Sequence, residues 1–327
     1  MIRLPVIYST HPLHPSAMHL LRGAGTLRVA TAHDAETLAR EGREADVVIV
    51  RVPVPEAMFV DAPRLRAAIR HGAGMDMVPI EAATRAGVLV ANTPGVNART
   101  VAEHVMLMAL SLCRRSRQID IALRSEGWHA GRAQTDLAGD LEGRTIGIIG
   151  MGDIGREVSR IARAGFGLQI VTATRRPETA PERVKTVTLA ELAVCADIVA
   201  ICCPLTPDTR GMVGADFISR MRPGGFLINI ARGAVIDDAA LIAALASGRI
   251  GGAALDVFVE QPLRPDHPYL GFDNVIVTPH AAGVTDDSLM RMATGAAAET
   301  LRVLRGDLPV NLRNPDAVAR FRRRFPA

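Results

Sequence analysis

The chain has 327 residues, a formal net charge of +4 and 48% hydrophobic residues, which suffices for two domains with their own cores and argues against extended disorder. No apolar run approaches the roughly 20 residues that a membrane helix needs, and prolines interrupt any signal-peptide pattern in MIRLPVIYSTHPLHP. Neither metal-site nor disulfide spacing is present among the cysteines Cys113, Cys195, Cys202 and Cys203. We therefore expect a cytoplasmic protein with reduced, buried thiols, no membrane partner and no metal.

Basic residues are spread along the chain, and their densest run is the terminal ARFRRRFPA. No surface that combines aromatic and basic residues accompanies this run, as a nucleic-acid site would require. The run predicts a solvated terminal helix, and we expect no nucleic-acid partner.

Short apolar runs alternate with helical patterns from end to end. The first set of expected strands comprises PVIY, ADVVIV, LRAAIR and GVLVANTP. A long helix is expected at about residues 100–124, where apolar residues recur at helical spacing without glycine or proline. The second set, typical of buried parallel strands, comprises GRTIGIIG, LQIVTA, ADIVAICCP, GGFLINIA, GGAALDVF and NVIVTPH. Another long helix is expected at about residues 285–304. This pattern predicts an α/β protein with two doubly wound parallel-sheet domains, the second inserted into the first.

A glycine-rich turn joins the first strand of the second set to an amphipathic helix. Its residues are Gly150, Gly152, Asp153, Ile154 and Gly155, with Met151 between the first two glycines. The first glycine permits the tight turn, the second lets the backbone approach a pyrophosphate, and the third lets the helix pack on the sheet. The free N–H groups of the helix N-terminus favour an anion. The turn predicts a dinucleotide-binding site.

Three residues occupy the place, about twenty residues further on, where an acidic side chain would bind the ribose hydroxyls. They are Thr174, Arg175 and Arg176. A hydroxyl tolerates a 2′-phosphate, and a guanidinium binds it through paired charge-assisted bonds. We therefore expect NADP to be preferred, with NAD possible; in the alternative interpretation the arginines merely face water beside Pro177.

Seven blocks in order make the chain resemble the D-isomer-specific 2-hydroxyacid dehydrogenase family. They are HGAGMD (71–76), NTPGVNARTVAEH (92–104), GMGDIG (150–155), CCPLTPDTRGMV (202–213), NIARGAVIDDAAL (229–241), ALDVFVEQPL (254–263) and TPHAAG (278–283). The resemblance implies a flavodoxin-like substrate domain of residues 1–99 and 284–327 around a Rossmann-type nucleotide-binding domain of residues 100–283. It places the substrate in the cleft between them. It also implies a homodimer through the nucleotide domains, and Gly127-Trp128 resembles part of the dimerising arm.

The resemblance also implies roles for single residues. His280 looks like the general acid that protonates the carbonyl oxygen during reduction, a task that suits a pKa near working pH. Arg232 looks like the group that pairs with the substrate carboxylate, whose other side the backbone N–H groups of Ala73 and Gly74 would hold. Asp256 resembles the residue that orients the nicotinamide carboxamide. Further cofactor contacts are expected from Cys203, Pro204, Thr209 and Ala231.

One position departs from the family pattern, which has a glutamate five residues after the aspartate. Gln261 stands there, and the carboxylate Glu260 comes one residue earlier. Glutamine can orient His280 but cannot stabilise an imidazolium by charge. Gln261 and Asn97, together with Arg232 and His280, also resemble the residue set of formate dehydrogenases, although the N-terminal extension typical of those enzymes is missing. A further alternative is a dinucleotide-sensing corepressor, which the intact arginine and histidine argue against.

The sequence thus predicts an NADP-preferring reductase of small 2-oxo acids, with glyoxylate or hydroxypyruvate as expected substrates and D-2-hydroxy acids as products. The distal group of the substrate would meet loops after early strands. Arg51, in one of these loops, is expected either to contact an extra anionic group or to face solvent.

Overall fold

A computed structural model describes residues 3–326 of the chain. The chain divides into two compact units. Unit 1 comprises the residues up to Asn97 together with those from Thr285 onward, and unit 2 comprises Ala98–Val284.

Unit 1 contains a parallel sheet of five strands in the order β2-β1-β3-β4-β5, which is the flavodoxin-like order. The strands are β1 (Val6–Ser9), β2 (Thr26–Val29), β3 (Val47–Val50), β4 (Ala67–Arg70) and β5 (Leu89–Ala91). The helices are α1 (Pro15–Leu21), α2 (Ala35–Arg43), η1 (Glu56–Phe59), α3 (Ile80–Ala86), α11 (Asp286–Leu304), η5 (Pro315–Ala317) and α12 (Val318–Arg324).

Both faces of this sheet are buried, because alternate side chains along each strand point to opposite sides. Ile7 and Ile49 pack with α1, α11 and α12 on one face. Tyr8 and Val48 pack with α2, η1 and α3 on the other. The continuous apolar runs of the sequence follow from this two-sided burial.

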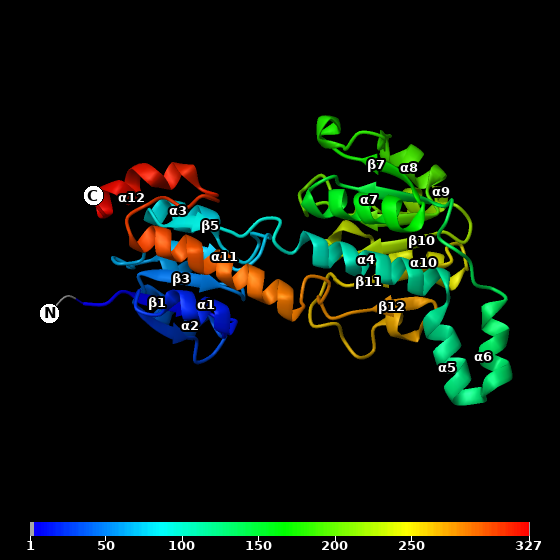
Figure 1. Ribbon diagram of the computed structural model, residues 1–327, viewed down its shortest axis with the longest axis horizontal. Helices are drawn as coiled ribbons and strands as arrows, with labels where there is room; N and C mark the ends of the chain where they lie inside the picture. Colours follow the sequence, from blue (N-terminus) through cyan, green and yellow to red (C-terminus); the bar gives the residue numbers. More distant parts are fainter. Residues whose placement is uncertain (1–2, 327) are drawn as a thin grey trace. The chain divides into compact units, whose positions relative to one another are not determined.

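Unit 2 contains a parallel sheet of seven strands in the order β12-β11-β10-β9-β6-β7-β8 (Figure 1). The strands are β6 (Thr145–Ile149), β7 (Gln169–Ala173), β8 (Lys185–Thr186), β9 (Ile198–Ile201), β10 (Phe226–Asn229), β11 (Gly252–Leu255) and β12 (Val275–Val277). The helices are α4 (Ala98–Cys113), α5 (Ser116–Glu126), α6 (Trp128–Thr135), α7 (Asp153–Phe166), η2 (Pro177–Thr179), α8 (Leu189–Cys195), α9 (Ala215–Arg220), η3 (Gly233–Val235), α10 (Asp238–Ala246) and η4 (Pro268–Gly271).

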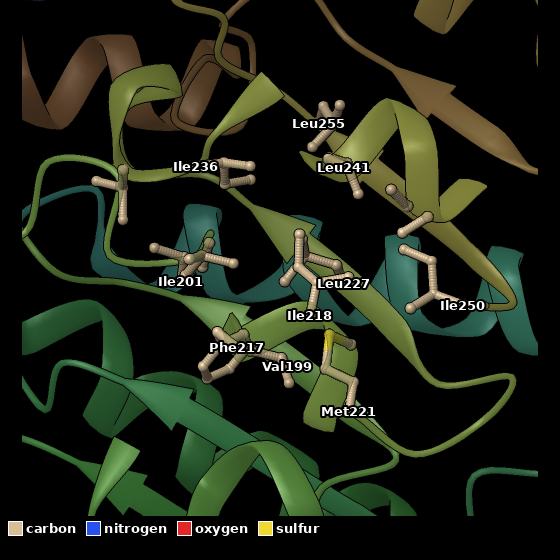
Figure 2. Packing of buried hydrophobic residues seen from close by; sticks show 14 of the residues in the cluster. Val199, Ile201, Phe217, Ile218, Met221, Leu227, Ile236, Leu241, Ile250 and Leu255 are labelled. Atoms are coloured by element: carbon tan, nitrogen blue, oxygen red, sulfur yellow. The ribbon is translucent and has the colours of Figure 1, made fainter. Parts of the chain in front are cut away.

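Helices cover both faces of this sheet as well. Figure 2 shows one face, where Phe217 of α9 and Leu241 of α10 lie among strand side chains such as Leu227. On the other face α4 and α7 pack over Ile148 and Ala200. The predicted fold class, two doubly wound parallel-sheet units, is confirmed.

Several local predictions were wrong. The helix expected at residues 100–124 is two helices, because Arg115 adopts a left-handed conformation (φ 53°) between α4 and α5. The sequence analysis did not predict the two-residue edge strand β8 or the strand β2. Strand β8 is exposed and β2 is largely exposed, so neither requires a continuous apolar run. The terminal helix α12 is not simply solvated, since Phe321 is buried and Arg324 donates hydrogen bonds to the backbone oxygens of Ala62 and Ala86.

Candidate active site

The glycine turn follows β6, and each of its three glycines has a different reason to lack a side chain. Gly150 has a φ of +96°, and a Cβ there would lie 2.8 Å from the backbone of Cys203. A Cβ on Gly155 would lie 2.3 Å from the Gly150 carbonyl oxygen, so this glycine lets α7 pack against the turn. Around a Cβ on Gly152 nothing lies within 4 Å, and this open space is where a pyrophosphate would approach the backbone.

The helix that follows the turn presents its N-terminus to that open space. Asp153 is the first residue of α7 and pairs with Arg156 at 2.6 Å, and Ile154 packs against the core under α4 and α7. In unit 2 the strand order reverses at β6 and β9, which is the topological switch point where doubly wound sheets bind ligands.

Arg175 and Arg176 lie at the carboxyl end of β7, the strand next to β6. The Arg176 backbone N–H donates to the Thr174 hydroxyl at 3.3 Å, and both arginine side chains are exposed. Arg175 lies 3.8 Å from the Asp208 carboxylate, which is also exposed, so the ion pair between them is weak. This acidic neighbour was not predicted from the sequence.

The loop after β9 contacts the glycine turn, since a Cβ on Gly150 would lie 2.8 Å from the Cys203 backbone. Burial raises the pKa of the Cys203 thiol to about 11, so this residue is a neutral packing group. The Thr209 hydroxyl donates to the Pro204 carbonyl at 2.8 Å and accepts from the Thr206 N–H at 2.7 Å. The Thr209 hydroxyl therefore stabilises the loop to which Thr209 belongs.

The expected catalytic residues lie at the carboxyl ends of three adjacent strands. Arg232 follows β10, Gln261 follows β11, and His280 follows β12. The loops of β10 and β11 meet at Gly233, where a Cβ would lie 2.0 Å from the Phe258 backbone. The Arg232 guanidinium donates to the adjacent Ala231 carbonyl at 2.6 Å.

His280 is oriented by Gln261, whose Oε1 lies 3.2 Å from Nδ1 of the ring. With the amide oxygen as acceptor, Nδ1 carries the proton, and Nε2 is the ring nitrogen that would exchange a proton with a ligand. Glu260, the other candidate partner, acts instead on Arg264. The pKa of Arg264 is raised by the hydrogen bonds that it donates to the Asp266 carboxylate and, to a smaller extent, by the negative charge of Glu260.

The backbone at His280 is strained and is fixed by Asp256. Its φ of 56° lies in the left-handed region, which non-glycine residues rarely adopt. The buried Asp256 carboxylate accepts from Ala281 N–H at 2.7 Å, from Ala282 N–H at 2.9 Å and from the Thr278 hydroxyl at 2.5 Å. Such strain persists where the surroundings over-determine it, as at functional sites.

His104 of α4 extends this network, because its Nε2 lies 3.3 Å from the Thr278 hydroxyl. Burial lowers the pKa of His104, and the Asp256 carboxylate partly opposes the shift. Sequence reasoning missed His104 and the anchoring role of Asp256, since these partners are distant along the chain. The sequence showed only that His104 and Thr278 each belong to a block of the family pattern, which does not indicate that the two side chains meet.

A pocket of about 630 Å³ in unit 2 includes Gln261 and His280 in its lining. It is lined by Phe258, Gln261, Pro262, Leu263, Val277, Thr278, Pro279 and His280. Within residues 3–326, no group of three or more His, Cys, Asp or Glu side chains is arranged to hold a metal ion. None of the described helices combines the length and apolar character that crossing a bilayer demands.

The remaining predicted residues belong to unit 1. The loop after β4 is held by Thr93, whose hydroxyl accepts from Gly72 N–H at 2.8 Å, and by Asn92, which donates to the Ala73 carbonyl at 2.7 Å. In the described part of the chain, the backbone N–H groups of Ala73 and Gly74 make no hydrogen bond and so are available to a carboxylate. Asn97 is the last residue of unit 1 before α4. Arg51 follows β3 and donates to the Pro12 carbonyl.

Residues 106–282 match the family described as "D-isomer specific 2-hydroxyacid dehydrogenase, NAD binding domain". The chain belongs to this family. It is also 35% identical to a glyoxylate reductase from Aeropyrum pernix over 97% of this chain and 98% of the relative. The 2-hydroxyacid dehydrogenase assignment that the motifs predicted is thereby confirmed, and the chain is an NAD(P)-dependent oxidoreductase.

Two further relatives of this dehydrogenase bear other names. A D-3-phosphoglycerate dehydrogenase from Methanocaldococcus jannaschii is 37% identical over 94% of this chain and 59% of the relative. The crystal structure of an NADPH-dependent glyoxylate/hydroxypyruvate reductase from Sinorhizobium meliloti, in complex with NADP and malonate, is 28% identical with a TM-score of 0.83. The alignment covers 96% of this chain and 98% of that one.

Proposed function

We propose that this dehydrogenase reduces small 2-oxo acids, such as glyoxylate and hydroxypyruvate, to D-2-hydroxy acids with a preference for NADPH. The observation that carries the proposal is the His280 ring, fixed by Gln261 on a turn that Asp256 holds, with Arg232 in the neighbouring loop. Relatives named glyoxylate reductase support the substrate class.

The glycine turn fits a dinucleotide, because the space at Gly152 is open and the N-terminus of α7 faces it. The nicotinamide supplies the hydride when it is bound. Arg175 and Arg176 bind the 2′-phosphate in this proposal, and the reductase solved with NADP supports that preference. The remaining expected contacts, at Pro204, Thr209 and Ala231, come from the loops after β9 and β10.

The side chains of the proposed site have separate roles in substrate binding and proton transfer. Arg232 pairs with the substrate carboxylate through its two-pronged guanidinium. The N–H groups of Ala73 and Gly74 in unit 1 are further donors that we propose for a substrate carboxylate. His280 donates the proton from Nε2 to the carbonyl oxygen as it becomes an alcohol. Gln261 accepts from Nδ1 and thereby holds the ring in the tautomer that this transfer needs. In this assignment unit 1 is the substrate domain and unit 2 the nucleotide domain.

We also infer a homodimer formed through α5 and α6, which pack on each other and extend from the rest of unit 2 (Figure 1). Large apolar side chains are exposed on and beside this pair, among them Ile121, Leu123, Trp128 (72% exposed) and Leu137. Such a concentration of apolar surface is typical of an interface. Light scattering on the protein and on Trp128→Ser tests this inference.

An initial-rate panel tests the function. It comprises glyoxylate, hydroxypyruvate and formate, each with both cofactors, followed by chiral analysis of the product. Reduction of a 2-oxo acid to the D-product with NADPH is the expected result. Formate oxidation without any 2-oxo acid reduction would instead favour the formate dehydrogenase reading of the Gln261–His280 pair. Absence of any turnover would favour a dinucleotide-sensing role.

A further inference from the structure

Helix α4 places a histidine against the carboxyl end of the seven-stranded sheet. His104 lies in the second turn of α4, and its Nε2 is 3.3 Å from the hydroxyl of Thr278, the residue directly after β12. Two turns farther along the helix, Leu112 packs at the other end of the sheet, because a Cβ on Gly252, the first residue of β11, would lie 3.2 Å from Leu112 Cδ2. Of these two side chains, only His104 lies at the end where the catalytic loops leave the strands.

The direction of the hydrogen bond between His104 and Thr278 follows from the other bond of the hydroxyl. Thr278 has a single hydroxyl proton and donates it to Asp256 Oδ1 at 2.5 Å. A carboxylate has only acceptors, so this bond cannot run the other way. The Thr278 oxygen therefore accepts from His104, whose Nε2 carries the proton. Burial lowers the pKa of His104, which favours a neutral ring with its one N–H at Nε2.

The carboxylate that receives this proton also holds the turn of His280. Asp256 Oδ1 accepts from the Ala281 N–H at 2.7 Å, and Oδ2 accepts from the Ala282 N–H at 2.9 Å. The His280 N–H donates to the backbone carbonyl of Asp256 at 2.8 Å. The left-handed backbone of His280 is thus held by hydrogen bonds that converge on Asp256. A continuous chain of bonds joins His104 to this turn.

Thr278 links helix α4 to the turn, and its side chain has little freedom of its own. A β-branched side chain is stiff about its first torsion, so one staggered position has to serve both Asp256 and His104. Hydrogen bonds in such a chain polarise one another, so a donor that points at the hydroxyl oxygen strengthens the bond from the hydroxyl to the carboxylate. Removal of the His104 donor would weaken that bond and leave the partly buried Thr278 oxygen without this partner.

We propose that His104 is a positioning residue, which fixes the His280 turn in the conformation needed for proton donation. It acts through Thr278 and Asp256, and its single N–H is the donor at which the chain of bonds begins. The role of His280 as proton donor rests on the proposed function. The chain of bonds itself lies wholly within unit 2, so it is present without substrate or cofactor.

Two substitutions of His104 separate the hydrogen bond from packing. His104→Gln keeps an N–H donor near the place of Nε2, whereas His104→Phe keeps a ring and removes the donor. We expect kcat for a 2-oxo acid to fall about tenfold in His104→Phe, the upper range for the loss of one hydrogen bond, and at most about threefold in His104→Gln. The KM for NADPH should stay nearly constant in both. Equal losses of kcat in the two variants would overturn the proposal.

The solvent deuterium isotope effect on kcat distinguishes positioning from a mere loss of folded enzyme. A smaller folded fraction lowers the rate equally in H2O and D2O, so the ratio of the two rates stays the same. A displaced His280 slows the proton transfer itself, so the ratio should rise in His104→Phe and stay near its original value in His104→Gln. Leu112→Ala is the matched control, because it opens a cavity under the same helix and should lower the melting temperature without changing the ratio. An unchanged ratio in His104→Phe would make His104 a packing residue only.

Amide hydrogen exchange tests the chain of bonds without substrate or cofactor. The N–H groups of Ala281 and Ala282 should exchange several-fold faster in His104→Phe than in the unmodified protein or in His104→Gln, because the turn opens more often. If no 2-oxo acid is reduced but this protection depends on the His104 donor, the function fails and the role of His104 in the turn stands. If 2-oxo acids are reduced and His104→Phe leaves exchange unchanged, the function stands and His104 does not position the turn. Faster exchange with an unchanged kcat would equally contradict the proposal.

Discussion

The Nδ1 atom of His280 lies 3.2 Å from the amide oxygen of Gln261, at the position where the family pattern has a glutamate. An amide orients the ring as a carboxylate would, but it adds no negative charge. A neighbouring carboxylate typically moves a partner's pKa by about 1–3 units toward the charged form. The proton-donating form of His280 therefore lacks one source of stabilisation in this enzyme.

Gln261→Glu should extend reduction toward alkaline pH. The added carboxylate raises the pKa of His280, so the imidazolium persists to higher pH and the falling limb of kcat/KM moves up by about one unit or more. The measurement is a pH profile with one 2-oxo acid. Glu260→Gln serves as the control and should leave the profile in place, because Glu260 acts on Arg264. The reverse pattern would show that Glu260 is the true partner.

Two glycines of the nucleotide turn should respond differently to alanine. Gly152→Ala places its Cβ in open space, so the protein should fold normally while the KM for the cofactor rises roughly tenfold or more, as hydrogen bonds to a phosphate are lost. Gly155→Ala places its Cβ 2.3 Å from the Gly150 carbonyl oxygen. Alanine contributes about 1 kcal/mol of helix propensity, but this overpacking costs about 1–3 kcal/mol. Thermal unfolding and cofactor titration together distinguish the two; loss of stability in Gly152→Ala would contradict the assignment.

The sequence could predict this turn because its constraints are local, whereas much of the site depends on tertiary partners. Asp256 anchors Ala281 and Ala282, and the pairing exists only because β11 and β12 are adjacent in the sheet.

The prediction of secondary structure failed where neither an apolar pattern nor a glycine or proline marked the element. The break at Arg115 occurs without glycine or proline, in a stretch whose apolar spacing is helical on both sides. The edge strand β8 pairs along one side only and is exposed, so it needs no apolar run. The strands of the sheet centres were predictable because burial on both faces demands continuous apolar residues.

Replacing Arg175 and Arg176 together by alanine should raise the KM for NADPH at least about tenfold and leave that for NADH nearly unchanged. Each charge-assisted bond to the 2′-phosphate contributes about 1.5–3 kcal/mol, and NADH lacks that phosphate. Asp208→Asn tests the opposite change. The Asp208 carboxylate lies 3.8 Å from Arg175 and competes with the 2′-phosphate for that guanidinium. That variant should bind NADPH slightly more tightly at low salt. Equal efficiency of both cofactors in the unmodified protein would refute the preference.

Arg232→Lys should damage turnover although the charge is retained. An ammonium cannot reproduce the two parallel hydrogen bonds of a guanidinium to a carboxylate. The loss of one such bond, at about 1.5–3 kcal/mol, lowers kcat/KM by roughly ten- to a hundredfold. Steady-state kinetics with a 2-oxo acid measures the effect, and Arg210→Lys, an exposed arginine of the loop after β9, serves as the control. Near-normal efficiency in Arg232→Lys would remove Arg232 from the substrate site.

Asp256→Asn should lower both stability and turnover, because the buried carboxylate accepts two backbone N–H groups and one hydroxyl around His280. An asparagine has only one acceptor oxygen, and its amide N–H group would face another donor. With about 2 kcal/mol lost, the melting temperature should fall by roughly 4–8 °C. The strained backbone of His280 would relax, so kcat should fall for every 2-oxo acid. Thr278→Val, which removes a single donor, should have a smaller effect of the same kind. A raised KM for NADPH with unchanged melting temperature and kcat would instead make Asp256 a nicotinamide contact alone.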